Sequence, residues 1–261
     1  MSLTPAAAPD PLAALLEFPG VAAAAESAQQ AVDRLLSHGV LRRRSALVAA
    51  ESLRRGAVAA ANLDGLAPAD SAGQPPLPAL RLYAELPALL PAWRRAPRQA
   101  LARMHVLVAR GRSPAEELGR PRTGPVGHDP LGLGAPPPVP EVSLRLDALA
   151  ALLVRPGSVR ATVLAAVVHG ELLTLRPFAV GNGLVASGAV RLTMVARGLD
   201  PQSLCVPEVA HATSATSYAA AARGYAGGSS QGVADWLVHC ARATEAGAVE
   251  GLAICEALRR G

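Results

Sequence analysis

The stretch that most constrains the fold of this chain is residues 161–197, in which a short glycine-rich turn joins two apolar segments. The first segment, 161–175, is apolar on nearly every face, which predicts a helix that is buried on most sides. An Arg-Pro-Phe turn follows at residues 176–178, then Gly181, Asn182 and Gly183, and then a second apolar helix over 185–197. A tight turn at a helix N-terminus presents backbone N–H groups to an anion. The stretch therefore predicts two central helices with an anion-binding site between them.

The composition favours an all-α protein. Hydrophobic residues make up 51% of the 261 residues but aromatic residues only 3%, so the core must consist mainly of Ala, Leu and Val. Ala and Leu favour helices because they lose little side-chain entropy there. The net charge is +5, and all 25 basic residues are arginine, which suits phosphate contacts. We favour a GC-rich coding bias as the cause of this arginine-only composition. The absence of lysine excludes Schiff-base and P-loop chemistry.

The cysteine pattern and the apolar runs predict a cytoplasmic protein. Cys205, Cys240 and Cys255 are widely spaced and form no CxxC pair, which argues against a disulfide framework and against a zinc site. We therefore expect no bound metal. No run of eighteen apolar residues is free of Gly, Pro or charge, and the N-terminus lacks the positive start of a signal peptide. We expect no membrane segment, and the sequence leaves the oligomeric state open.

Periodicity and Pro/Gly breaks divide the chain into helices. Besides the two central helices, we expect helices at 21–37, 42–53, 80–90, 98–110, 142–153, 213–223 and 232–260. Pro91 and Pro97 are expected to separate the helices at 80–90 and 98–110. Residues 67–78 are rich in Pro, Gly and Ser, which predicts a loop and a boundary between a leader with a helical extension, 1–78, and the main domain, 79–261. Residues 111–140 show no helical period and predict a functional flap, with a short hairpin around 123–126.

Residues 176–187, RPFAVGNGLVAS, resemble the motif H-P-F-x-[D/E]-G-N-G-R-x-x-R of the Fic (Fido) family. Gly119 to Thr123 resembles the flap of that family, and Tyr218 to Ala221 with Asp235-Trp236 resembles its C-terminal part. The resemblance covers residues 80–245. It implies a Fic-like helical bundle with a small flap or hairpin and an N-terminal helical extension.

Family members mostly transfer AMP from ATP to a protein hydroxyl, and this chain departs from the motif at the chemical positions. The position of the general base is Arg176, which stays protonated. The position of the carboxylate that holds Mg²⁺ is Val180, which has no ligand atom. The two phosphate-binding arginines are replaced by Leu184 and Ser187. The resemblance therefore implies a Fic domain without AMP transfer, and we expect neither ATP nor Mg²⁺ as a cofactor.

The resemblance also implies three sites that remain. Arg176 with Gly181, Asn182 and Gly183 is a candidate site for an anion or a nucleotide. The flap residues Arg120, Arg122 and Thr123 lie where the family adds a segment of its target protein as an extra strand. Residues 60–65 resemble the inhibitory helix motif [S/T]-x-x-x-E-[G/N] with Asp64 as the acidic residue. In the family this acidic residue pairs with the last arginine of the motif. That position is Ser187 here, so we expect no ion pair.

Three functional hypotheses follow. The first is a catalytically degenerate Fic-domain protein that binds a partner protein or a nucleotide-like anion. The second is a transferase with altered chemistry, in which Arg176 acts electrostatically and His169 or His128 is the base. The third is a nucleic-acid-binding protein with arginine clusters at 42–44, 54–55 and 94–98 as its footprint. The sequence leaves two roles open for Arg176: it binds a phosphate, or it forms an ion pair at a helix C-terminus. We favour a buried structural role for His169 and a surface salt bridge for Arg191.

Overall fold

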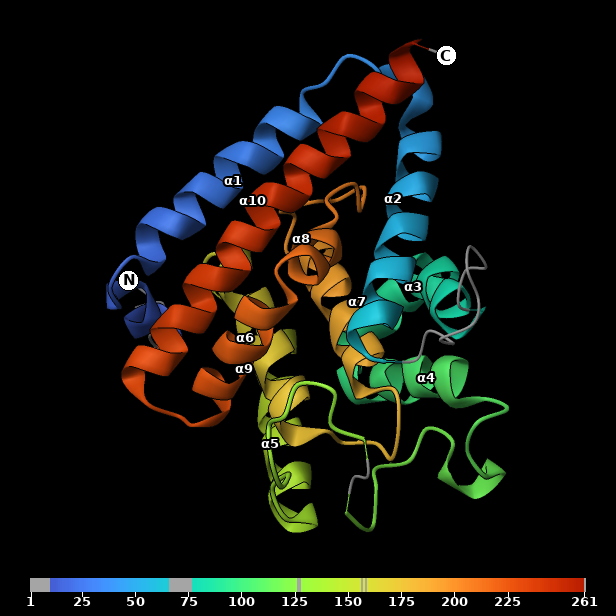
Figure 1. The fold of residues 1–261 in the computed structure, drawn as a ribbon, viewed down its shortest axis with the longest axis vertical. Coiled ribbons are helices and arrows are strands. Elements are labelled where there is room, and N and C mark those ends of the chain that lie inside the picture. The colour runs from blue at the N-terminus through green and yellow to red at the C-terminus, as the bar shows by residue number, and fades with distance from the viewer. Residues whose placement is uncertain (1–9, 66–76, 126–127, 156, 158, 261) are drawn as a thin grey trace, which may run out of the picture.

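The computed structural model describes residues 10–65, 77–125, 128–155, 157 and 159–260. These residues form ten α-helices and two short 3₁₀-helices, with no strand beyond one isolated bridge between Arg110 and Ser113. The all-α prediction is confirmed (Figure 1). The helices are α1 (Val21–Leu36), α2 (Leu41–Leu63), α3 (Leu77–Arg95), α4 (Pro97–Ala109), α5 (Val139–Val154), α6 (Ala161–Leu175), α7 (Asn182–Ala196), α8 (Pro207–Thr213), α9 (Ala215–Ala226) and α10 (Ser230–Arg260). None of these helices combines the length and the apolarity needed to cross a membrane.

Helices α6 and α7 lie at the centre of the molecule and pack against each other (Figure 1). Nearly all residues of both helices are buried, as their uniform apolarity predicts. Helix α3 covers α7, and the long helix α10 crosses α6 and runs alongside α1. The bounds of α6 agree with the prediction, and α7 begins three residues earlier than predicted. The glycine-rich turn therefore starts α7 directly at Asn182.

The predicted end of the second helix at residue 53 is wrong, because α2 has a kink at Arg44 but continues to Leu63. Gly56 lies inside it, where a Cβ atom would collide with the guanidinium group of Arg191. The glycine is present because another side chain approaches the backbone, not because the helix ends. As a result α2 extends to its C-cap residue, Asp64.

The prediction that Pro91 ends the third helix is also wrong. Pro87 and Pro91 both lie inside α3 and both are exposed. Each proline removes one hydrogen bond to the carbonyl four residues earlier, and for Pro91 that carbonyl belongs to the exposed Pro87, where water can bind it instead. The opposite face, with Leu82, Leu86 and Leu89, remains buried. Burial of this face stabilises the helix across both prolines.

The segment predicted as a flap lies between α4 and α5. It holds a 3₁₀ turn at Ala115–Glu117 and otherwise irregular backbone. Its described residues form no hairpin, and residues 126–127 lie outside the described part of the chain. The predicted loop at 67–78 also lies mostly outside the described part of the chain. One hydrophobic core includes Val21 and Ala57 together with Leu164 and Leu184, so the division at residue 78 stays a prediction.

Candidate functional site

The loop between α6 and α7 is held by its own side chains. Arg176 ends α6 in the left-handed conformation, with φ 42° and ψ 64°. The amide of Asn182 closes the turn: its oxygen accepts the N–H of Phe178 at 2.9 Å, and its nitrogen donates to the Phe178 carbonyl at 2.8 Å. The Phe178 ring stacks on His105, with the ring centroids 4.2 Å apart. Asn182, predicted to bind an anion, thus has its side chain engaged in shaping the loop.

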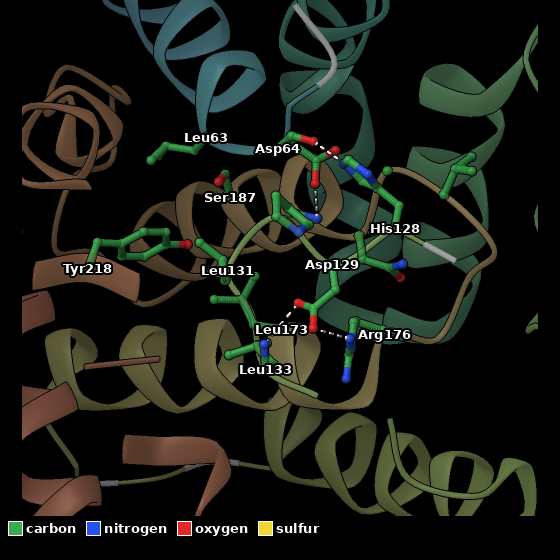
Figure 2. A pocket seen from close by; sticks show the side chains of 15 residues that line it. Leu63, Asp64, His128, Asp129, Leu131, Leu133, Leu173, Arg176, Ser187 and Tyr218 are labelled. Atoms are coloured by element: carbon green, nitrogen blue, oxygen red, sulfur yellow. Dashed lines mark hydrogen bonds and ion pairs between the residues drawn. The ribbon is translucent and has the colours of Figure 1, made fainter. Parts of the chain in front are cut away.

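The N-terminus of α7 is capped by a carboxylate from this chain. Asp64, at the end of α2, accepts the N–H of Gly183 through Oδ1 at 2.9 Å and is 3% exposed (Figure 2). A negative charge is favourable at this end of a helix. A Cβ atom on Gly183 would collide with the Asp64 carboxylate, so the contact requires glycine there. Asp64 thus occupies the site that was predicted for an external anion, and its partner is a backbone amide rather than the side chain of Ser187.

Burial strongly affects the ionisation of Asp64. Desolvation raises the pKa of its carboxyl group to about 6, although the N–H groups of Gly183 and Leu184 and the charge of His128 oppose the rise. The second carboxylate oxygen, Oδ2, is buried without a hydrogen-bond partner among the described residues. Nε2 of His128 donates to the backbone carbonyl of Asp64 at 2.6 Å. His128 is therefore engaged with the residue that caps α7.

Arg176 forms an ion pair in this structure. Its Nη1 lies 3.3 Å from Oδ2 of Asp129, and its Nη2 donates to the Gly134 carbonyl at 2.6 Å. Asp129 also accepts the backbone N–H groups of Leu133 and Gly134. Arg176 is only 4% exposed. Of the two roles left open by the sequence, the structure supports the ion pair, with Asp129 as a partner that sequence reasoning did not identify.

The three flap residues have different environments. Arg122 is buried, and its backbone N–H donates to the Pro177 carbonyl at 2.8 Å. Its Nε donates to the carbonyl of Arg176 at 2.9 Å, and further bonds reach the carbonyls of Gly124 and Pro137. Arg120 and Thr123 are exposed on either side of it. Arg122 therefore fastens the flap to the loop, and its two neighbours face the solvent.

A small cavity lies between these groups. Its volume is about 30 Å³, which holds one or two water molecules and is far below the roughly 300–1,000 Å³ of ligand pockets. Its polar lining residues are Asp64, His128, Asp129, Arg176, Asn182, Ser187 and Tyr218, and Val180 and several leucines supply apolar surface (Figure 2). Val180 offers no oxygen, and Leu184 is fully buried. The side chains of Val180 and Leu184 therefore supply no atom that could bind Mg²⁺ or phosphate.

Two further predicted positions lie in the core. His169 is buried, its Nε2 lies 3.0 Å from the Tyr218 hydroxyl, and burial lowers its pKa to about 3. The structural role that we favoured for His169 agrees with this environment. Arg191 forms a fully buried ion pair with Glu208, with Nε 2.6 Å from Oε1. The prediction of a surface salt bridge is wrong, because α2 and α8 cover this side chain.

No family model and no curated protein sequence matches the chain. Solved structures do match it, and they establish that the chain has the Fic fold. A Fic family protein from Desulfovibrio desulfuricans G20 superposes with a TM-score of 0.66 at 20% identity, over 90% of this chain and 74% of that chain. Fic-1 from C. elegans superposes with a TM-score of 0.59 at 18% identity, with the same coverage of 90% and 74%. The fold predicted from the motif resemblance is thus confirmed, and likeness at these identities concerns the fold alone.

Proposed function

We propose that this Fic-fold protein does not transfer AMP and acts by binding a protein partner. The observation that carries the proposal is the contact of Asp64 with the N–H of Gly183. This contact places a carboxylate of the chain where the phosphates of a nucleotide would approach the start of α7. Arg176, the neighbouring cation, is bound to Asp129. The N–H of Gly183 and the guanidinium group of Arg176 are therefore both engaged, and a nucleotide could bind them only after the site rearranges.

The chemistry of the motif positions supports the same proposal. Transfer of AMP needs a general base, a metal ligand and cations that stabilise the moving phosphoryl group. Arg176 cannot accept a proton, Val180 cannot bind Mg²⁺, and Ser187 carries no charge. A nucleotide-like anion remains a second ligand class, but it would have to displace the Asp64 carboxylate. The cavity of about 30 Å³ favours the partner over the anion.

The other two hypotheses have less support. An altered transferase would need a base near Arg176, but His169 is bonded to Tyr218 and His128 to the Asp64 carbonyl. A nucleic-acid footprint would need free arginines. Arg54 and Arg55 both bond to Glu51, Arg55 also pairs with Glu250, and Arg98 pairs with Asp147. These pairs engage both arginines of the cluster at 54–55 and one of the three arginines at 94–98.

Isothermal titration tests the absence of nucleotide binding. We expect wild-type protein to bind ATP no better with Mg²⁺ than without it, and a labelled-nucleotide assay in cell extract to show no transfer. If Asp64 blocks the end of α7, Asp64→Ala should gain metal-independent affinity for ATP, whereas the exposed Asp33→Ala should not. Tight, Mg²⁺-dependent binding to wild-type protein, or label transfer, would contradict the proposal. The double variant Arg176→His with Val180→Asp is the fair control for dormant chemistry.

A photo-crosslinking residue tests partner binding. Thr123 is exposed beside the buried Arg122, so a crosslinker there faces whatever docks on the flap. We expect it to capture a protein from cell extract, while the same residue at exposed Ala23 on α1 captures none. Equal yields at positions 123 and 23 would show that capture is non-specific and would remove the support for docking at the flap.

A further inference from the structure

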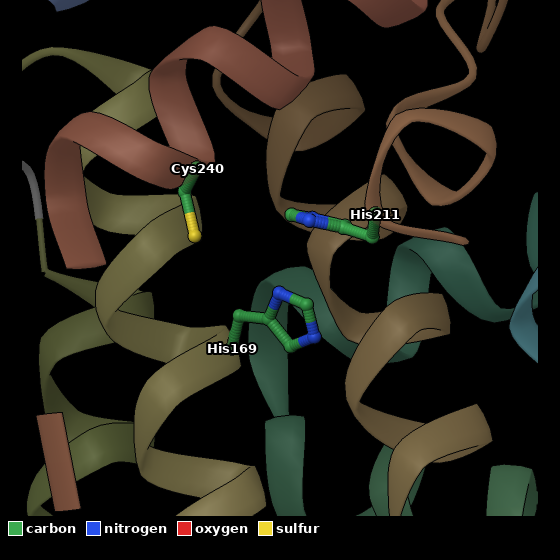
Figure 3. Close-up of side chains that lie close together, drawn as sticks. All are labelled: His169, His211 and Cys240. Atoms are coloured by element: carbon green, nitrogen blue, oxygen red, sulfur yellow. The ribbon is translucent and has the colours of Figure 1, made fainter. Parts of the chain in front are cut away.

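Three side chains that commonly bind metals meet in the core, in a group that contacts the lining of the cavity through Tyr218. His169 on α6, His211 on α8 and Cys240 on α10 each offer one ligand atom, and these atoms all lie within 4.8 Å of one another. Figure 3 shows the three side chains converging from their three helices. They are 2%, 4% and 7% exposed, respectively. Among the described residues, no other group of three His, Cys, Asp or Glu side chains meets this condition.

Neighbouring side chains hold the second nitrogen of each histidine. Nε2 of His169 lies 3.0 Å from the Tyr218 hydroxyl, and Nδ1 of His211 lies 3.1 Å from Nε2 of His239. Metal-bound histidines almost always have such a partner on the nitrogen that does not bind the metal, because it fixes the tautomer and the ring orientation. Each ring thus keeps one nitrogen as a ligand atom. The arrangement has the outer hydrogen bonds of a metal site as well as its ligand types.

We propose that His169, His211 and Cys240 bind a Zn²⁺ ion. Two imidazoles and one thiolate are ligands that Zn²⁺ prefers, and a water molecule would complete a tetrahedral set of four. Binding forms a Zn–S bond and releases the thiol proton of Cys240 to solvent. His239, which contacts His211, is half-buried.

Aromatic packing is the competing explanation for the same cluster. The His169 ring lies 5.2 Å from Trp236 and 5.4 Å from His211, both in edge-on contact. Packing of this kind needs no thiol and gives no preference for a metal. Cys240 therefore distinguishes the two explanations, since its sulfur bonds directly to Zn²⁺ in one and only fills space in the other.

Metal titration of the full chain tests the proposal. Protein stripped with a chelator should bind one equivalent of Zn²⁺ in competition with a chromophoric chelator, release a proton and melt at a higher temperature. Co²⁺ in place of Zn²⁺ should give a thiolate-to-metal charge-transfer band. These measurements use the wild-type chain, so they do not depend on whether a variant folds. Absence of both the band and the thermal shift at saturating metal would overturn the proposal.

Variants assign the ligands. Cys240→Ser should abolish the charge-transfer band, whereas Cys255→Ser, at a buried cysteine in a separate cluster of the core, should keep it. His239→Ala should weaken Zn²⁺ binding about 10- to 100-fold and keep the band at saturating Co²⁺, because His239 orients a ligand without being one. Retention of Zn²⁺ with unchanged affinity in Cys240→Ser would mean that the metal binds elsewhere, and the proposal would fail.

Discussion

Replacement of Glu208 by alanine is expected to lower the free energy of unfolding by about 3–5 kcal/mol. The carboxylate accepts two hydrogen bonds from Arg191, at 2.6 and 2.9 Å, and a third from the Tyr83 hydroxyl at 2.9 Å. The side chains of Arg191 and Glu208 are 2% and 3% exposed. Without Glu208, the guanidinium group stays buried with oxygens of Ser52 and Ser203 as its hydrogen-bond partners, the Tyr83 ring 5.4 Å from it and the attraction of Asp200 as its electrostatic support. An unpaired buried charge is among the most destabilising changes in a protein core.

Urea unfolding of purified variants measures this loss. Glu141→Ala is the control, because it removes a partly exposed pair with Arg145 and should cost less than about 1 kcal/mol. The double variant Arg191→Met with Glu208→Leu removes both charges and should recover about half of the loss or more. A loss below about 1 kcal/mol for Glu208→Ala would mean that water reaches the pair.

This ion pair also helps to position the candidate site. Arg191 bonds to the hydroxyl and the carbonyl of Ser52, and it fits against α2 where Gly56 leaves room. It thereby fixes α2 against α7, and the end of α2 carries Asp64 to the N-terminus of α7. The capped helix terminus thus depends on contacts about two to three turns earlier in α2, at Gly56 and Ser52.

The fold was predictable where local patterns and packing agree. Residues 161–175 are apolar at most positions, and the left-handed Arg176 before Pro177 ends the helix where the sequence indicates. Prediction failed where tertiary contacts override local signals. Gly56 and Pro91 both usually interrupt helices, but an approaching arginine explains the first and an exposed position explains the second. Helix α8 was missed because a helix of seven residues carries too few periodic positions.

The site was predictable only in part. The motif resemblance identified Gly183 and Asp64 as site residues, but it could not indicate that they bind each other. That contact depends on the length of α2, which we predicted to end at residue 53 and which extends to Leu63. Asp129 was missed because a single acidic residue in an irregular segment has no distinguishing pattern. The three proposed zinc ligands were missed because cysteine spacing reports only on sites built from local sequence.

The stability of the protein should depend on pH through Asp64. Its folded-state pKa is about 6, against an ordinary value of 3.8. Since the folded state binds the proton more tightly than the unfolded state, the stabilising contribution of this group is complete below about pH 4 and is lost as the pH rises through about 6. The raised pKa corresponds to about 3 kcal/mol. Asp64→Asn cannot ionise and keeps an oxygen that accepts the N–H of Gly183, so it should lack this loss.

Urea unfolding between about pH 4 and pH 7.5 tests this prediction. The stability of Asp64→Asn relative to wild type should increase by about 3 kcal/mol across that range, with most of the change between the two pKa values. The exposed Asp33→Asn should show no such change, and it controls for the other groups that titrate in the same range. A constant difference between Asp64→Asn and wild type would mean that the end of α7 keeps the carboxylate ionised throughout. In that case an external anion would face a permanently charged competitor at Gly183, and nucleotide binding would lose its remaining support.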